Sequence, residues 1–226
     1  VTDGGKAGLG DSYNFVLVDV TGHGIPAALT VNRLHGELER IFAENPETPP
    51  GEVLRLLNSY VHLTLATHSV YVTAICIRIR PTTDSLEYAS GGHPPAFLKA
   101  VDGTLEQLDS TALVLGACAG ADFRSEQRKM RFGPGDVLIA YTDGATEARD
   151  LQGRYFGIAG LQRAVATGHP DPEGGWPATI LKHVESHRYG PTADDILLIE
   201  VRRPLNLGPD SKTRAATAVR VGAARR

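Results

Sequence analysis

Three short apolar runs in this chain are joined directly to aspartates, and this combination restricts the folds that the chain can adopt. Two of the runs, Phe15–Asp19 and Val137–Asp143, end in an aspartate, and the third follows Asp194 and Asp195. Short runs that are apolar throughout are typical of strands buried on both faces. A carboxylate at the tip of such a strand lies where the core meets a loop, so several of them can face one shared rim.

A shared rim of carboxylates predicts a metal site. Carboxylate oxygens are hard ligands, and Mg²⁺ or Mn²⁺ prefers such ligands. The chain has no Gly-x-x-x-x-Gly-Lys loop, no Gly-x-Ser-x-Gly elbow and no Cys-His nucleophile arrangement. We therefore expect any hydrolysis to use a water activated by bound metal, without a covalent intermediate.

The first apolar run is followed by two predicted helices. Pro26 stands where a first helical residue is expected, because its missing N–H is harmless there. Val31, Leu34 and Leu38 then recur at helical spacing and predict one buried face. A second helix is expected to begin near Glu52.

The rest of the chain contains strand patterns and two more predicted helices. Residues 70–79 are expected to form a strand buried on both faces, and residues 123–132 a two-sided strand. Helices are expected over 158–166 and 176–187, before a last strand over 196–201. This order predicts an α+β fold. A four-layer α–β–β–α sandwich would cover the apolar strands with helices, and we favour it.

Composition excludes several classes of protein. The net charge is -3, with 23 Lys+Arg against 26 Asp+Glu, so a nucleic-acid partner is not expected. Cys76 and Cys118 have no metal-binding spacing and predict a reducing, cytoplasmic setting. No apolar stretch approaches the roughly 20 residues that span a bilayer, so no membrane partner is expected. Residues 204–226 are rich in Ala and Arg and are expected to be a disordered tail or linker.

Each motif also has a simpler interpretation. Asp19 can cap the following helix, Asp143 can belong to an Asp-Gly hairpin turn, and Asp194–Asp195 can be a solvated pair. His23 and His93 lie next to glycines, where histidine is more typical of loop packing than of catalysis. Taken singly, the motifs leave both interpretations open.

Taken together, the motifs resemble a known family. The ordered segments are Asp19-Val-Thr-Gly-His-Gly-Ile-Pro-Ala-Ala28, Tyr88-Ala-Ser-Gly-Gly-His-Pro-Pro95, Tyr141-Thr-Asp-Gly-Ala-Thr-Glu-Ala148, Phe156-Gly157 and Asp194-Asp-Ile196. This set, from about Phe15 to Arg203, closely resembles the SpoIIE-type branch of the PPM family. Members of that branch are bacterial metal-dependent protein serine/threonine phosphatases.

The resemblance implies a fold and a set of site residues. It implies one phosphatase domain over residues 1–203, an α–β–β–α sandwich with two Mn²⁺ or Mg²⁺ ions. Asp19 matches the carboxylate that bridges the metals, and Val20 matches the residue whose backbone carbonyl binds one of them. Asp143 and Asp194 match further metal ligands, and Asp195 is a weaker candidate. The expected catalytic residues are therefore Asp19, Asp143 and Asp194.

The resemblance also implies a substrate and partners. Family members hydrolyse phosphoserine or phosphothreonine, usually on an anti-anti-sigma (STAS) protein that controls a sigma factor by partner switching. A sensor domain upstream in the same polypeptide would act through the two helices between Pro26 and about Ala66. The sequence leaves a homodimer open.

Two departures from the family pattern weaken the expected site. Family members begin with Gly-Gly-Asp, whose aspartate is a further metal-site carboxylate. Here Asp3 precedes Gly-Gly and lies 16 positions before Asp19, so we expect the first strand and that aspartate to be missing or replaced. Leu197 stands where the family usually has Thr. The alternatives are a catalytically impaired module that docks STAS or sensor proteins, and a sandwich domain without metal.

Overall fold

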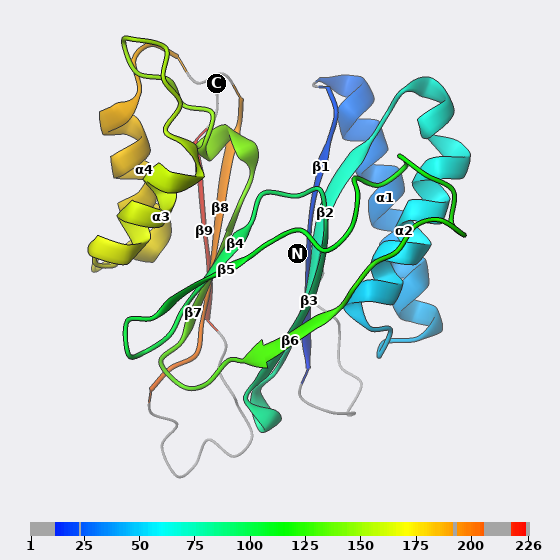
Figure 1. The fold of residues 1–226 in the computed structure, drawn as a ribbon, viewed down its shortest axis with the longest axis horizontal. Coiled ribbons are helices and arrows are strands. Elements are labelled where there is room, and N and C mark those ends of the chain that lie inside the picture. Colours follow the sequence, from blue (N-terminus) through cyan, green and yellow to red (C-terminus); the bar gives the residue numbers. More distant parts are fainter. Residues whose placement is uncertain (1–11, 23, 192–193, 206–217, 225–226) are drawn as a thin grey trace. The chain divides into compact units, whose positions relative to one another are not determined.

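The computed structural model describes residues 12–22, 24–191, 194–205 and 218–224. These residues divide into two compact units. Unit 1 comprises the described residues up to His93 together with Ser110–Arg131. Unit 2 comprises Pro94–Asp109 and the described residues from Phe132 onward. Each unit has one antiparallel sheet and two α-helices, which confirms the α+β class (Figure 1). None of the described helices is long and apolar enough to cross a membrane.

Unit 1 is a four-stranded sheet with two helices on one face (Figure 1). The strand order is β1-β2-β3-β6, and all neighbours are antiparallel. The predicted first strand, both helices and the strand near residue 70 are confirmed. The elements are β1 (Tyr13–Val20), α1 (Ile25–Glu44), α2 (Pro50–Thr64), η1 (Ala66–His68), β2 (Val72–Arg80), η2 (Pro81–Thr83), β3 (Ser85–Gly91) and β6 (Arg128–Arg131).

The buried face of α1 differs by one position from the predicted face. Leu34 and Leu38 are buried as expected, but Val31 is 43% exposed and Thr30 is buried in its place. Thr30 precedes Leu34 by four residues, so both side chains lie on the same side of the helix. The Thr30 hydroxyl donates a hydrogen bond to Pro26 O at 3.0 Å, so burial leaves it satisfied.

The predicted strand over residues 123–132 is wrong for its first half. Only β6, the last part of it, pairs with β3. The preceding segment bonds instead to the first turn of α2: Ser125 Oγ donates to Gly51 O at 2.7 Å, and Gly51 N donates to Gln127 Oε1 at 3.3 Å. Because these bonds hold the segment away from the β3 ladder, the strand starts only at Arg128.

Unit 2 is a five-stranded antiparallel sheet with α3 and α4 packed on one face (Figure 1). The strand order is β5-β4-β7-β8-β9. The predicted helices near residues 158 and 176 and the last predicted strand are confirmed. The elements are β4 (Ala96–Lys99), β5 (Leu105–Leu108), β7 (Val137–Tyr141), η3 (Asp143–Ala145), α3 (Gly157–Thr167), α4 (Gly175–His187), β8 (Ile196–Arg202) and β9 (Ala218–Ala224).

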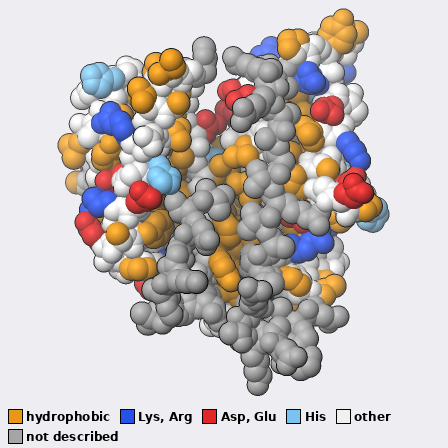
Figure 2. All heavy atoms as spheres, turned by 180° about the vertical axis from the view of Figure 1, so that it is seen from behind, with side chains coloured by type: hydrophobic (Ala, Val, Ile, Leu, Met, Phe, Trp, Pro, Cys, Tyr) orange, Lys and Arg blue, Asp and Glu red, His pale blue; other side chains and the backbone are white. Residues whose placement is uncertain are grey.

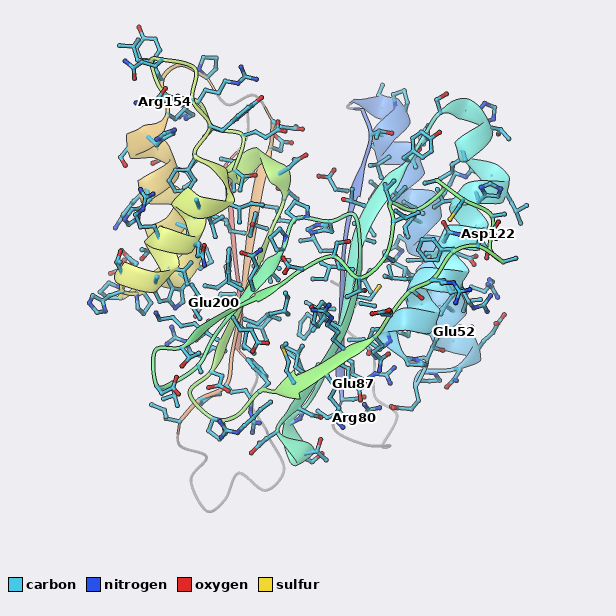
Figure 3. The ribbon with its side chains drawn as sticks, viewed as in Figure 1. Glu52, Arg80, Glu87, Asp122, Arg154 and Glu200 are labelled. Carbon is cyan, nitrogen blue, oxygen red and sulfur yellow. The ribbon has the colours of Figure 1, made fainter. Side chains whose placement is uncertain are left out.

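Two polar side chains of the sheet form hydrogen bonds with the backbones of α3 and α4. Lys99 Nζ donates to Val165 O at 3.0 Å, near the end of α3, and lies 5.5 Å from the ring centroid of Trp176. Glu200, which is 1% exposed and is labelled in Figure 3, accepts a hydrogen bond from Trp176 N at 2.8 Å. A carboxylate on the first N–H groups of a helix complements their partial positive charge. The second Glu200 oxygen pairs with Arg202 at 2.9 Å, so the buried charge is compensated.

The tail after residue 203 contains a strand, in contrast to the expected disorder over 204–226. Residues 218–224 form β9, which pairs with β8 along its whole length, from Arg202 opposite Ala218 to Ile196 opposite Ala224. Alternating Val219 and Val221 suit a strand. Residues 206–217 and 225–226 lie outside the described residues.

Candidate active site

Asp143 and the Asp194–Asp195 pair lie at one edge of the sheet of unit 2. They flank β7 and β8, which are antiparallel neighbours, so the end of β7 meets the beginning of β8. Thr142 N donates to Leu197 O at 3.0 Å, and Leu197 N donates to Thr142 Oγ1 at 3.0 Å. The β7–β8 ladder therefore brings together three of the five predicted site residues.

Thr142 and Gly144, which were not predicted as site residues, hold the aspartate pair in place. Thr142 Oγ1 donates to Asp195 O at 3.2 Å. A Cβ atom on Gly144 would lie 2.5 Å from Asp195 O and 3.3 Å from Asp194 O. The backbone of the pair thus packs against the position next to Asp143, and only glycine leaves room for it. The signal was present in the Thr-Asp-Gly segment, but it acquires this meaning only through the pairing of β7 with β8.

Asp143 begins a 3-10 turn, so its interpretation as part of an Asp-Gly hairpin is wrong. The turn is η3, in which Asp143 O accepts hydrogen bonds from Thr146 N at 2.8 Å and Glu147 N at 2.9 Å. The Asp143 side chain is partly exposed, whereas the strand before it is buried throughout. The carboxylate therefore lies where the core ends and solvent begins.

Asp194 and Asp195 are both exposed. Asp195 N donates to Asp194 Oδ1 at 2.8 Å, which orients the first carboxylate of the pair. The two adjacent carboxylates and the third at Asp143 make this edge locally negative. Such a set of oxygen ligands suits a divalent cation.

Tyr141, the residue before Thr142, packs in the core. It is 1% exposed and stacks on Phe97 with ring centroids 6.2 Å apart. Burial raises the pKa of its phenol well above the ordinary value, so the hydroxyl stays protonated. No described residue gives this hydroxyl a hydrogen-bond partner.

Asp19 and Val20 belong to unit 1, at the end of β1. Asp19 lies opposite Thr73, and Val20 lies opposite Val72 in the β1–β2 ladder. Asp19 does not occupy the N-cap position of α1, because that residue is Gly24. Asp19 is partly exposed, and Val20 is 9% exposed.

The Gly-Gly-His-Pro-Pro segment has a structural use, as the sequence indicated. Gly92 N donates to Ala112 O at 3.2 Å, and a Cβ on Gly91 would lie 3.0 Å from Leu113 O. His93 is buried at 3% exposure. The two glycines let this segment pack closely on the chain near residue 112. His23 lies outside the described residues.

The predicted metal ligands divide between the two units. Within the part of the chain that the structure describes, no three His, Cys, Asp or Glu side chains form a group that could hold a metal ion. The donor chemistry still fits Mg²⁺ or Mn²⁺, because Asp143, Asp194 and Asp195 offer only hard oxygen atoms at one edge. The edge in unit 2 is therefore a set of oxygen donors rather than a complete metal cage.

Replacing Gly144 by Ala should displace the aspartate pair. The new Cβ would meet the backbone of Asp195 at 2.5 Å, and backbone atoms cannot move aside as a flexible side chain can. We expect a loss of about 1–3 kcal/mol in the free energy of unfolding, measured by denaturant titration. Gly36→Ala is the control, because no atom beyond its chain neighbours and the backbone of its own helix lies within 4 Å of the new Cβ, and alanine favours the α1 helix. Equal stability of the Gly144→Ala and wild-type chains would contradict this packing.

The fold is that of a PP2C-type phosphatase domain. The structure is similar to the SiaA-PP2C domain of Pseudomonas aeruginosa, with a TM-score of 0.68, 16% sequence identity, and coverage of 85% of this chain and 80% of that chain. It is also similar to RsbX solved in complex with magnesium, with a TM-score of 0.52, 15% identity, and coverage of 81% of this chain and 82% of that chain.

Similarity in sequence identifies the family to which the chain belongs. The family model described as Stage II sporulation protein E (SpoIIE) matches residues 10–204, and the chain belongs to this family. The phosphoserine phosphatase RsbU of Bacillus subtilis is 31% identical to this chain over 146 residues, which are 63% of this chain and 42% of RsbU. The chain thus spans less than half of the length of that relative. The resemblance to the SpoIIE branch is confirmed.

Proposed function

We propose that this chain is a metal-dependent phosphatase domain that hydrolyses phosphoserine or phosphothreonine on a STAS anti-anti-sigma protein. The observation that carries the proposal is the edge of unit 2 where β7 and β8 present Asp143 and Asp194–Asp195 together. Membership of the SpoIIE family and similarity to a phosphoserine phosphatase support it. A sensor domain upstream in the same polypeptide and a cytoplasmic location belong to the same proposal.

The proposal assigns metal binding to carboxylate and carbonyl oxygens. Asp143, Asp194 and Asp195 are the proposed ligands from unit 2, and Asp19 with the carbonyl of Val20 are those from unit 1. Magnesium in the RsbX structure supports a divalent cation for this fold. When bound, Mn²⁺ or Mg²⁺ supplies positive charge to the phosphate and lowers the pKa of water.

The chain's own residues hold the oxygen donors in position. Thr142 fixes the backbone of Asp195, and Gly144 leaves room for it. Without a cation, the negative edge would repel the dianionic phosphate of the substrate. The reaction should therefore depend on the divalent ion in two respects. The ion would activate water, and its positive charge would offset the repulsion between the carboxylates and the phosphate.

Release of phosphate from a phosphorylated STAS protein tests this function. We expect release in the presence of Mn²⁺ or Mg²⁺ and none in EDTA, because the carboxylates carry no positive charge of their own. A malachite-green assay measures the product, and re-addition of the metal should restore the rate. Phosphate release that persists at the same rate in EDTA would overturn the proposal.

A second candidate function is a binding module that docks the STAS protein without hydrolysis. The observation that favours it is the absence, among the described residues, of a group of three metal-ligating side chains. Calorimetric titration with Mn²⁺ separates the two. The phosphatase should bind the ion and gain thermal stability from it, whereas the module should bind phosphoprotein and show no response to the ion.

A further inference from the structure

The loop that follows η3 is closed and internally bonded. Arg149 and Tyr155 form a β-bridge across its base. The carboxylate of Asp150 accepts hydrogen bonds from Gln152 N and Arg154 N, both at 2.9 Å, and from Arg154 Nε at 2.8 Å. Local bonds of this kind fix the path of a loop, so its side chains are presented from a defined backbone.

The last residue of α4 and the residues just after it form hydrogen bonds with the same loop. Tyr189 N donates to Arg149 O at 2.8 Å. His187 Nε2 forms a hydrogen bond of 3.0 Å with Arg154 O, and its ring lies 5.4 Å from that of Phe156. The loop and the residues after α4 therefore make one continuous piece of surface within unit 2.

This surface exposes three large side chains close together in the loop and after α4. Leu151 is 65% exposed, Tyr155 is 52% exposed and Tyr189 is 68% exposed. Arg149 is also exposed, and its guanidinium carbon lies 4.3 Å from the centroid of the Tyr155 ring. We call these four residues the Arg149 surface. Hydrophobic and basic side chains lie together at this end of unit 2 (Figure 2).

The charge of the Arg149 surface is positive. Arg154, labelled in Figure 3, is neutralised by Asp150 at 2.8 Å. Arg149 makes no ion pair with any carboxylate in the described part of the chain; its guanidinium instead bonds the Tyr155 hydroxyl and lies over that ring. A guanidinium held by an aromatic ring loses little side-chain entropy on binding a carboxylate or phosphate.

The Arg149 surface lies beside the candidate active site. The stem of the loop is tied to η3, because Glu147 N donates to Asp143 O and Gly157 N donates to Thr146 O, both at 2.9 Å. The loop and η3 are at the same end of unit 2 in Figure 1. A protein whose phosphorylated residue reaches Asp143 would therefore extend over this surface.

We propose that the Arg149 surface is the docking site for the phosphoprotein substrate, which it contacts through an acidic and partly apolar patch next to the phosphorylated residue. Tyrosine and arginine on a rigid support are the residues that most often dominate binding between proteins. The inference rests on the proposed phosphatase function and adds the surface that selects the substrate.

Two variants of the whole chain test the docking site. Arg149→Glu reverses the charge, and Tyr189→Ser removes an exposed aromatic ring whose loss should leave the fold intact. With a phosphorylated STAS protein as the probe, we expect Kd, measured by fluorescence anisotropy, to rise about tenfold in each variant. In Mn²⁺, the ratio of kcat/KM for the phosphoprotein to kcat/KM for p-nitrophenyl phosphate should fall by about the same factor.

Arg163→Glu is the matched control, since Arg163 is an exposed residue of α3 in the same unit and the change in net charge is identical. We expect its Kd and its kinetic ratio to stay within about twofold of wild type. Unchanged Kd in both test variants, or an equal loss in the control, would overturn the docking site. Absence of hydrolysis of both substrates by the wild-type chain would instead refute the proposed function, and the Kd values would still decide the docking site.

Discussion

The Asp143→Asn variant is expected to release phosphate in Mn²⁺ at least about 100-fold more slowly than wild type. Removing a residue that only supports a metal ligand costs up to about 100-fold, and removing a ligand should cost at least as much. The substitution keeps the shape of the side chain and removes its charge. In the structure Asp143 follows a fully buried strand and is partly exposed at the edge it shares with the Asp194–Asp195 pair. Loss of one anion from this edge should weaken both cation binding and the charge compensation of the phosphate.

The stability of the Asp143→Asn variant should be close to that of wild type in EDTA. The hydrogen bonds that shape η3 use the backbone carbonyl of Asp143, and the substitution leaves that carbonyl in place. In Mn²⁺, however, the wild-type chain should melt at a higher temperature than the variant, because only the wild type binds the ion strongly. Melting curves with and without Mn²⁺ measure this difference.

Asp109→Asn is the matched control for Asp143→Asn. Asp109 is an exposed aspartate in the same unit, and it accepts a hydrogen bond only from the neighbouring Gln107 side chain among the described contacts. We expect its phosphate release to remain within about twofold of wild type. Wild-type activity in Asp143→Asn, or a similar loss in Asp109→Asn, would show that the edge formed by β7 and β8 is not the reaction site.

The parts of the site that sequence could predict are those determined by one strand at a time. The run Val137–Tyr141, which Thr142 separates from Asp143, is apolar at every position, and all five of these residues, which form β7, are buried. Likewise the run after Asp195 forms β8. The roles of Thr142 and Gly144 could not be read in this way, because each depends on which strand lies beside β7. Their hydrogen bond and close approach reach residues more than fifty positions away.

Elements with weak patterns were predicted less well, for identifiable reasons. Leu105–Leu108 has only its two end residues apolar, and it becomes β5 because β4 offers an edge to pair with. Residues 218–224 are short and rich in alanine, yet the edge of β8 accepts them as β9. The exposed side chains at Leu151 and Tyr155 give no signal in a single sequence, since only the folded loop shows that they are not covered.

Arg78 is buried in the middle of the sheet of unit 1 and joins three separate segments. Its side chain is 2% exposed. It donates hydrogen bonds to Asn14 Oδ1 at 3.0 Å, to Glu47 O at 3.1 Å and to Thr48 O. Burial lowers the pKa of its guanidinium, although arginine remains protonated near neutral pH. The connection between α1 and α2 is thereby held to β2.

Arg80, two residues further along β2, provides the matched control for Arg78. It pairs with Glu47 at 2.7 Å and with Glu87 at 2.9 Å, and its side chain is 29% exposed. Arg80 and Glu87 are both labelled in Figure 3. Its hydrogen bond lowers the pKa of the Glu47 carboxyl. A lowered carboxyl pKa stabilises the fold at neutral pH, and the contribution is lost as the pH falls through that pKa.

Arg78→Met should destabilise unit 1 by about 3 kcal/mol, whereas Arg80→Met should cost less than about 1 kcal/mol. The first substitution keeps an unbranched chain in the core but leaves the carbonyls of Glu47 and Thr48 without their donor. The second removes only ion pairs that solvent can replace. Urea unfolding followed by circular dichroism measures both, and the Arg80→Met difference should disappear in acid. Equal losses in the two variants would mean that the buried hydrogen bonds contribute no more than the solvent-accessible ion pairs.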